Sequence, residues 1–296
     1  MGGMTVLEWP LCSPPGYIRR VIPLATSARH SAWCISWGEA QRQSIYSDPA
    51  YLDGYYTSQP ASGLAAARMS ALLTYRSRDS FESRFGRRPQ VDPTLTPPAS
   101  PKPSLSSNDA VLAHNDGLRN PKLRTTDAPQ DTLSSAHPPP RQPAIFSAQS
   151  YLRYQGEKFT ARFDANCYIH ITRKLDSHDL ARGRVDPADE IGLGEVLAAL
   201  PPRALVISIA SDGLFTPFEQ KEIAGHIPDA ELVVIPSPAG HDGFLLELEQ
   251  INAHIVKYLK TEFPQYYEAE IEAVDEDFSV KKTSIFGEAE VDVTRW

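Results

Sequence analysis

The sequence predicts an α/β fold in which helices flank a parallel sheet. Two short apolar runs with β-branched residues, 204–209 and 231–235, are typical of buried strands. The residues between them, 218–228, predict a helix that ends at Pro228. The order strand, helix, strand indicates parallel pairing. A final helix is predicted from apolar residues that share one helical face: Phe244, Leu248, Ile251, Ile255 and Leu259.

The N-terminal residues are also predicted to be folded. MGGMTVLEWP, residues 1–10, has the pattern of a helix, and residues 17–25 have that of a strand. Residues 63–75 are rich in alanine and leucine near helical spacing, which predicts a further helix. Residues 150–179 are expected to form two helices rich in Tyr, Phe and Leu.

Composition changes sharply in the middle of the chain. The stretch 89–145 holds 12 of the 26 prolines and has no apolar periodicity, so we predict a long disordered insertion there. Six parts follow in chain order: a partial α/β core (1–50), a first helical segment (51–88), the insertion (89–145), a second helical segment (146–184), an α/β core with two polar loops (185–260) and an acidic tail (261–296).

Charge and composition exclude several classes of protein. The net charge of -8 argues against a nucleic-acid surface, which would need clustered Lys and Arg. No stretch approaches the roughly 20 apolar residues of a membrane helix, and no signal peptide is seen. Cys12, Cys34 and Cys167 have no metal-ligand spacing, and their odd number gives no disulfide framework. The sequence therefore predicts a cytoplasmic protein without a metal or membrane partner.

Two loops place ionisable residues after the predicted strands, where open α/β sheets build their sites. Ser211-Asp212-Gly213 follows the first strand, and Gly240-His241-Asp242 follows the second. An Asp followed by a His on consecutive strand ends is the chain order of the last two members of a Ser–Asp–His triad. The His would act as general base and the Asp would orient it. A turn role for the Asp and a structural role for the His are the alternatives.

A triad also needs a nucleophile on a strained strand-to-helix turn of the form G-x-S-x-G. No such motif occurs in 1–296. Met-Gly-Gly followed by a helix matches the second half of this turn, where glycines allow a tight turn and close helix–strand packing. We therefore expect the serine directly before Met1, in a truncated reading frame in which Met1 is an internal residue.

Six blocks together resemble the homoserine O-acetyltransferase family, whose fungal branch carries low-complexity insertions. In chain order they are MGGMTVLEWP, IPLATSARHSAW, GLAAARMSALLTYRS, SYLRYQGEKFTARFDANCYIHITRKLDSHDLARGR, SDGLF and GHDGFL. The resemblance implies the C-terminal portion of an α/β-hydrolase fold. The helical segments 51–88 and 146–184 would be the two parts of a lid that covers the sheet and favours transfer over hydrolysis.

The family transfers an acetyl group from acetyl-CoA to the hydroxyl of L-homoserine, a step of methionine biosynthesis, through an acyl-serine intermediate. The resemblance thus implies two small-molecule substrates, acetyl-CoA as co-substrate rather than a bound cofactor, and a homodimer through the lid. Deacetylcephalosporin C and L-serine are the alternative acceptors, because related families share most of the blocks. A non-catalytic remnant that lacks the serine is the alternative to an enzyme.

The resemblance also implies roles for six residues. Asp212 and His241 would be the acid and base of the triad, and the backbone N–H of Met1 would form half of the oxyanion hole. Asp242 would meet the amino group of homoserine. Arg68 would pair with the carboxylate of homoserine, and Tyr75, two helical turns later, would share its face.

Overall fold

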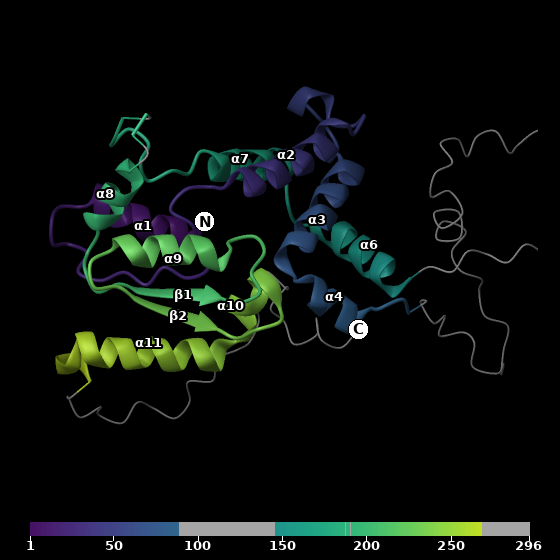
Figure 1. Cartoon of the computed structure of the whole chain (residues 1–296). Coiled ribbons are helices and arrows are strands. Elements are labelled where there is room, and N and C mark those ends of the chain that lie inside the picture. Colours follow the sequence, from purple (N-terminus) through teal and green to yellow (C-terminus); the bar gives the residue numbers. More distant parts are fainter. Residues whose placement is uncertain (89–145, 187, 190, 268–296) are drawn as a thin grey trace, which may run out of the picture. The chain divides into compact units, whose positions relative to one another are not determined.

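The computed structural model describes residues 1–88, 146–186, 188–189 and 191–267 (Figure 1). The predicted insertion, 89–145, lies outside the described residues, as does the tail from 268 onward. Contacts divide the chain into two compact units, Met1–Arg84 with Gln155–Trp296, and Phe85–Tyr154. In the second unit the ring of Phe85 lies 5.0 Å from that of Tyr151. The six-part division from composition stays an interpretation.

The predicted parallel strand pair is confirmed. Strand β1 (Leu205–Ile209) pairs with β2 (Glu231–Ile235) in parallel, and helix α9 (Pro217–His226) connects them. A Thr216 capping box and Pro217 in the first turn begin α9. Figure 1 shows α9 and α11 (Leu248–Glu262) on opposite faces of the pair. Because the two strands run parallel, their carboxyl ends lie at the same edge of the pair.

The strand predicted over residues 17–25 is reduced to a single bridge residue. It runs beside β1, where the carbonyl of Pro23 accepts from the N–H of Ile207 (3.0 Å) and the N–H of Ala25 donates to the carbonyl of Ile207 (2.9 Å). Only Leu24 forms a bridge, parallel to Ile207. Pro23 has no N–H, so the ladder lacks one hydrogen bond and no regular strand develops.

The prediction that both strands are buried along their length holds for β1 and is wrong for β2. Every residue of β1 is buried, whereas in β2 burial alternates: Val233 and Ile235 are buried and Val234 is 45% exposed. Alternation is typical of a strand with one face on the core. Among the described strands, β2 pairs with β1 alone.

The predicted final helix is two helices. Glu247 has φ -93° and ψ 43°, which ends α10 (Gly243–Leu246) before α11 begins. Ile251 packs against the strands as expected, but Leu248 is 63% exposed and the prediction for it is wrong. Helix α11 and a short turn, Pro264–Tyr266, continue into the region predicted as tail.

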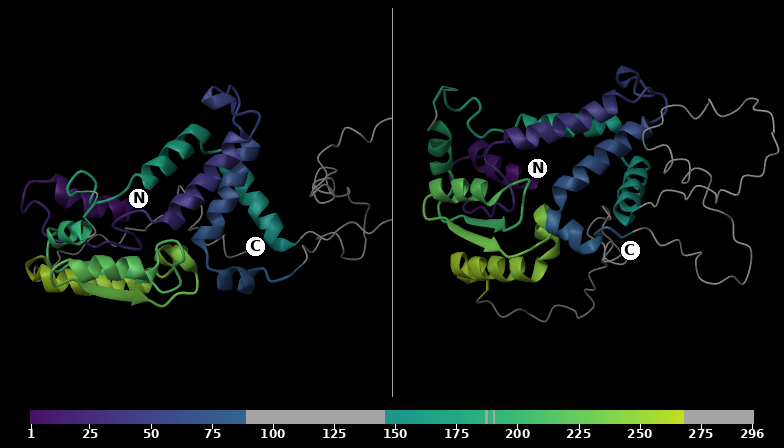
Figure 2. Two further views of the ribbon diagram at one scale, coloured as in Figure 1. Left: turned by 45° about the horizontal axis from the view of Figure 1, so that its top comes forward. Right: turned by 45° about the vertical axis from the view of Figure 1, so that its right-hand side comes forward.

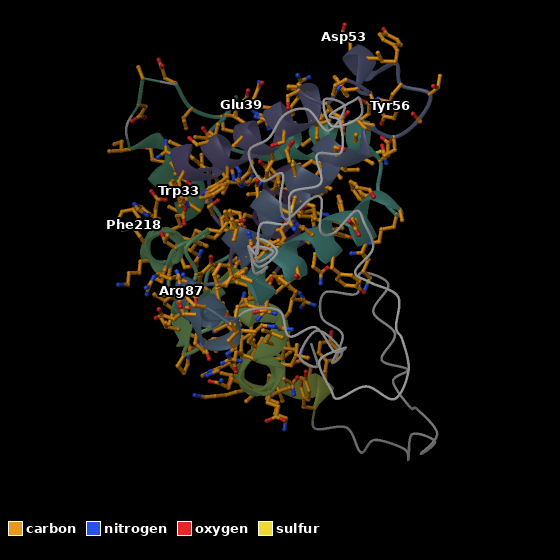
Figure 3. All side chains as sticks on the ribbon, turned by 90° about the vertical axis from the view of Figure 1, so that its right-hand side faces the viewer. Trp33, Glu39, Asp53, Tyr56, Arg87 and Phe218 are labelled. Atoms are coloured by element: carbon orange, nitrogen blue, oxygen red, sulfur yellow. The ribbon has the colours of Figure 1, made fainter. Side chains whose placement is uncertain are left out.

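Further helices come from residues 32–84 and 147–176 (Figure 2). In chain order they are α2 (Ala32–Tyr46), a short turn (Leu52–Gly54), α3 (Ala61–Tyr75), α4 (Arg78–Arg84), α6 (Ser147–Thr160) and α7 (Ala165–Asp176). Helices α3, α6 and α7 confirm the helices predicted over 63–75 and 150–179. Ser31 and Asp164 cap α2 and α7 by accepting from the third helical N–H. Trp33 at the start of α2 and Phe218 at the start of α9 are both exposed (Figure 3).

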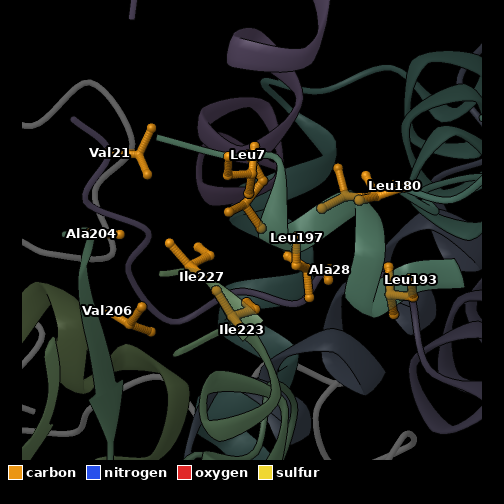
Figure 4. Packing of buried hydrophobic residues seen from close by; sticks show 12 residues of the cluster. Leu7, Val21, Ala28, Leu180, Leu193, Leu197, Ala204, Val206, Ile223 and Ile227 are labelled. Carbon is orange, nitrogen blue, oxygen red and sulfur yellow. The ribbon is translucent and has the colours of Figure 1, made fainter. Parts of the chain in front are cut away.

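One core cluster joins α1 (Gly2–Cys12), α8 (Gly192–Ala198) and α9 (Figure 4). Leu7, Leu197 and Ile223 meet there and are fully buried. A second cluster packs α2 and α3 around Ile45 and Leu64. None of the described helices is long and apolar enough to cross a membrane.

Candidate active site

The loops after β1 and β2 bring Asp212 and His241 together. Oδ2 of Asp212 lies 2.7 Å from Nδ1 of His241. The other oxygen of Asp212 accepts hydrogen bonds from the N–H groups of Leu214 (2.8 Å) and Phe215 (2.9 Å). A carboxylate can only accept, so Nδ1 of His241 carries the proton and Nε2 is left as an acceptor. The pair thus has the geometry of a general base and its orienting acid.

The His241 loop depends on a glycine beside it. Gly240 has φ +76°, and its N–H donates to Oγ of Ser211 at 2.9 Å, which ties the two loops together. A Cβ at this position would collide with the backbone of Arg76 and Ser77. Only glycine combines this φ with so close a backbone approach.

A cavity of about 340 Å³ adjoins His241. Its walls come from the loops and from α2, α3, α6 and α7. Four of the six residues predicted for the site line it: Met1, Arg68, Tyr75 and His241. Asp212 lies behind His241 as its hydrogen-bond partner, and Asp242 is not among the lining residues.

Arg68 brings a buried positive charge to the cavity. Arg68 is 6% exposed. Its guanidinium carbon lies 4.8 Å from the ring centre of Phe159 and 5.3 Å from that of Tyr75. Aromatic faces stabilise such a cation. Arg68 and Tyr75 come from one face of α3, as their spacing predicts.

Asp242 is paired with a residue that the sequence analysis did not single out. Nε of Arg76 lies 2.8 Å from Oδ2 of Asp242, and both side chains are largely buried. Burial raises the pKa of Asp242, and the charge of Arg76 lowers it. Arg76 follows Tyr75 directly in the block GLAAARMSALLTYRS, which is the signal that could have identified it.

His30 and Cys34 also line the cavity and were missed as site residues. Burial lowers the pKa of His30 to about 4, so its ring is neutral at pH 7. The thiol of Cys34 donates to the carbonyl of Leu214 at 3.1 Å, and burial raises its pKa to about 11. A neutral thiol is a poor nucleophile, so Cys34 serves as a wall of the cavity.

Aromatic rings enclose the imidazole of His241. Its ring centre lies 5.2 Å from that of Phe215 and 5.0 Å from that of Phe244. Within the described ranges, no serine or cysteine makes a hydrogen bond to His241, and no three metal-ligating side chains gather. Gly3 lies so close to Thr26 that a Cβ on it would collide with the threonine side chain.

Comparison with known proteins extends these observations. Residues 1–248 match the model of the α/β hydrolase fold family. The chain is 50% identical over 381 residues to a homoserine O-acetyltransferase of Cryptococcus neoformans var. grubii, covering 100% of this chain and 71% of that protein. It is 48% identical over 331 residues to the homoserine O-acetyltransferase of Saccharomyces cerevisiae, covering 100% of this chain and 67% of that protein.

Two solved structures share the fold. Esterase E22 has a TM-score of 0.61 at 19% identity and covers 87% of this chain and 58% of its own. The homoserine O-acetyltransferase of Bacillus anthracis has a TM-score of 0.61 at 15% identity and covers 92% of this chain and 59% of its own. The chain thus spans about two thirds of its curated relatives' length and less of these two structures.

Proposed function

Because the chain belongs to the homoserine O-acetyltransferase family within the α/β-hydrolase fold, we propose that it transfers an acetyl group to the hydroxyl of L-homoserine. The observation that carries the proposal is the hydrogen bond between Asp212 and His241 beside a cavity that Arg68 also lines. An imidazole base and a buried guanidinium beside one cavity match the needs of an amino acid that accepts through its hydroxyl.

The proposed donor is acetyl-CoA, and the proposed path runs through an acyl-serine. Nε2 of His241 first takes the proton of the serine hydroxyl and returns it to the leaving thiolate. It then takes the proton of the homoserine hydroxyl while the hydroxyl oxygen attacks the acyl-serine carbonyl, and it returns that proton to the serine oxygen as the acyl–serine bond breaks. Among the described residues, no serine is hydrogen-bonded to His241.

The proposed binding roles come from the family, and the charges of the residues agree with them. Arg68 pairs with the carboxylate of homoserine, and Tyr75 shares its face of α3. Asp242 meets the ammonium group, and Arg76 holds Asp242 in place for it. The backbone N–H of Met1, on the cavity wall, stabilises the oxyanion.

The walls of the cavity favour transfer over hydrolysis. Trp37, Phe159 and Leu175 line it with His241. Apolar walls exclude water once substrates fill the cavity, so the hydroxyl of homoserine meets the acyl group first.

The test is an acyl-transfer assay on the full-length protein. Acetyl-CoA is supplied with L-homoserine, L-serine or deacetylcephalosporin C, and products are identified by mass spectrometry. We expect O-acetylhomoserine as the main product and its loss in His241→Ala. His170→Ala, an exposed residue on α7, is the matched control and keeps the activity. Homoserine as the poorest acceptor, or release of acetate alone, overturns the proposal.

A further inference from the structure

Gln41 presents a buried amide to the cavity beside His241. It lies on α2, is 7% exposed, and lines the cavity together with Arg68 and His241. The hydroxyl of Tyr168, on α7, donates to Oε1 of Gln41 at 2.7 Å. Burial raises the pKa of Tyr168, so this hydroxyl keeps its proton at neutral pH. The bond holds the amide of Gln41 in one orientation and uses its acceptor.

The nitrogen of the same amide is left for a ligand. Among the described residues, none accepts a hydrogen bond from Nε2 of Gln41, and Nε2 does not belong to the unpaired side-chain atoms that are closed off from solvent. Because Gln41 is more than nine-tenths buried and lines the cavity, the accessible surface of Nε2 faces that cavity. An amide that is held by its oxygen and open at its N–H can donate to a bound molecule.

Arg68 brings a positive charge to the same part of the wall. Its guanidinium carbon lies 4.8 Å from the ring centre of Phe159, and that ring lies 5.9 Å from the ring of Tyr168. Burial raises the pKa of Tyr168, and the charge of Arg68 opposes that rise. Packing therefore brings the guanidinium near the pair formed by Tyr168 and Gln41.

The other polar groups of the wall leave this place suited to an anion. Among the described residues that line the cavity, Asp176 is the one acid, and its Oδ2 lies 2.6 Å from Nη2 of Arg42, which compensates its charge. The hydroxyl groups of Thr74 and Thr172 donate to carbonyls of their own helices. A neutral N–H donor near a guanidinium favours an anionic acceptor with more than one oxygen, such as a carboxylate.

We propose that Gln41 is a specificity-determining residue, which donates from Nε2 to the carboxylate of the acceptor amino acid beside Arg68. This inference rests on the proposed function, in which that carboxylate pairs with Arg68. A carboxylate has two oxygens, so it can accept from the guanidinium and from the amide at once. The ammonium group lies toward Asp242 in that function. Gln41 therefore recognises an acceptor by its carboxylate and not by its amino group.

Three acceptors and two variants of the full-length protein test the proposal. Besides L-homoserine, γ-hydroxybutyrate keeps the carboxylate and lacks the amino group, whereas propanolamine keeps the amino group and lacks the carboxylate. Gln41→Met removes the N–H without adding a charge, and Gln41→Glu keeps an acceptor for Tyr168. For both variants we expect kcat/KM to fall about tenfold or more with homoserine and γ-hydroxybutyrate, the loss of one hydrogen bond to a charged group. The values for propanolamine and for acetyl-CoA should change less than about twofold.

Gln43→Glu is the matched control, because Gln43 makes the same chemical change possible on the exposed side of α2. It should leave kcat/KM for all three acceptors unchanged. Equal losses with homoserine and propanolamine would show that Gln41 only supports the fold, and a loss with propanolamine alone would assign it to the ammonium group. A loss confined to acetyl-CoA would assign it to the donor. Each of these results overturns the proposal.

Binding of homoserine separates this inference from the proposed function. If the wild-type protein acetylates none of the three acceptors, the proposed function fails. Calorimetry with homoserine on wild type and Gln41→Glu then decides on Gln41 alone. Weaker binding by the variant supports the contact, whereas equal affinities, or no binding by the wild type, overturn it.

Discussion

The carboxylate of Asp242 and the guanidinium of Arg76, 2.8 Å apart, join the loop that carries His241 to the end of α3. Both side chains are largely buried. The ion pair therefore holds His241 and the wall that carries Arg68 in one arrangement. A buried pair of this kind is costly to break on one side, because the remaining charge has no partner.

Arg76→Gln is expected to destabilise the protein in a pH-dependent way. Burial already raises the pKa of Asp242 from 3.8, and removal of Arg76 raises this pKa further. When the pKa of a carboxyl is higher in the folded state than in the unfolded state, stability falls as the pH rises from the unfolded pKa through the folded pKa. The loss in unfolding free energy should be small near pH 4 and about 2–3 kcal/mol at pH 7.

Urea unfolding of wild type and Arg76→Gln at the two pH values measures this difference. Arg78→Gln is the control. Arg78 and its partner Asp79 are exposed, and exposed ion pairs contribute little to the free energy of unfolding. Equal losses at both pH values would show that Arg76 acts by packing rather than by charge.

Asp212→Asn is expected to lower kcat of the full-length protein by about 10⁴-fold with little change in the KM for homoserine. The amide has the shape of the carboxylate, but it also presents an N–H group and favours the wrong tautomer of His241. Steady-state kinetics with acetyl-CoA and homoserine measure the effect. Asp79→Asn, on the surface, makes the same chemical change and should leave kcat unchanged. A loss that appears mainly in KM would assign Asp212 a binding role.

The parts that sequence could predict depend on local patterns. Strand β1 is one apolar run, and Asp212 and His241 come directly after strands that pair in parallel, so chain order alone brings them together. The end of a strand is a position that a short pattern specifies. Arg68 and Tyr75 were chosen from the family resemblance, and the spacing of one helix predicts only that they share a face.

The remaining features depend on contacts between distant segments. Helix α2 has no clear apolar period because it buries Gln41 and Arg42 as well as Ile45. The charge of Arg42 is compensated by Asp176 on α7, which no local pattern shows. The exposure of Val234 depends on what lies beside β2. Tertiary context thus decided these points.

His30→Gln is expected to flatten the pH dependence of stability in acid. Burial lowers the pKa of His30 from 6.5 to about 4, against a raising effect of Asp176 and a further lowering by His178. A histidine with a lowered pKa contributes stability above pH 6.5 that is lost as the pH falls toward 4. The wild type should lose about 3 kcal/mol more than the variant across this window. Chemical denaturation at pH 4.5 and 7 tests it, with the exposed His170→Gln as control. Parallel pH profiles of wild type and His30→Gln would contradict it.

Gly240→Ala and Gly225→Ala should act in opposite directions. Gly240 has φ +76°, and a Cβ there would collide with the backbone of Ser77 at the end of α3. The strain and the collision should cost about 2–4 kcal/mol of unfolding free energy. Because the His241 loop has to move to relieve the collision, acyl transfer should fall as well.

Gly225 lies within α9 with nothing near its Cβ position, so alanine there should stabilise the protein by about 0.5–1 kcal/mol. Thermal unfolding of both variants, together with the acyl-transfer assay, measures the two effects. A stable Gly240→Ala protein with wild-type activity would show that the loop can accommodate a Cβ at position 240, and it would contradict the prediction.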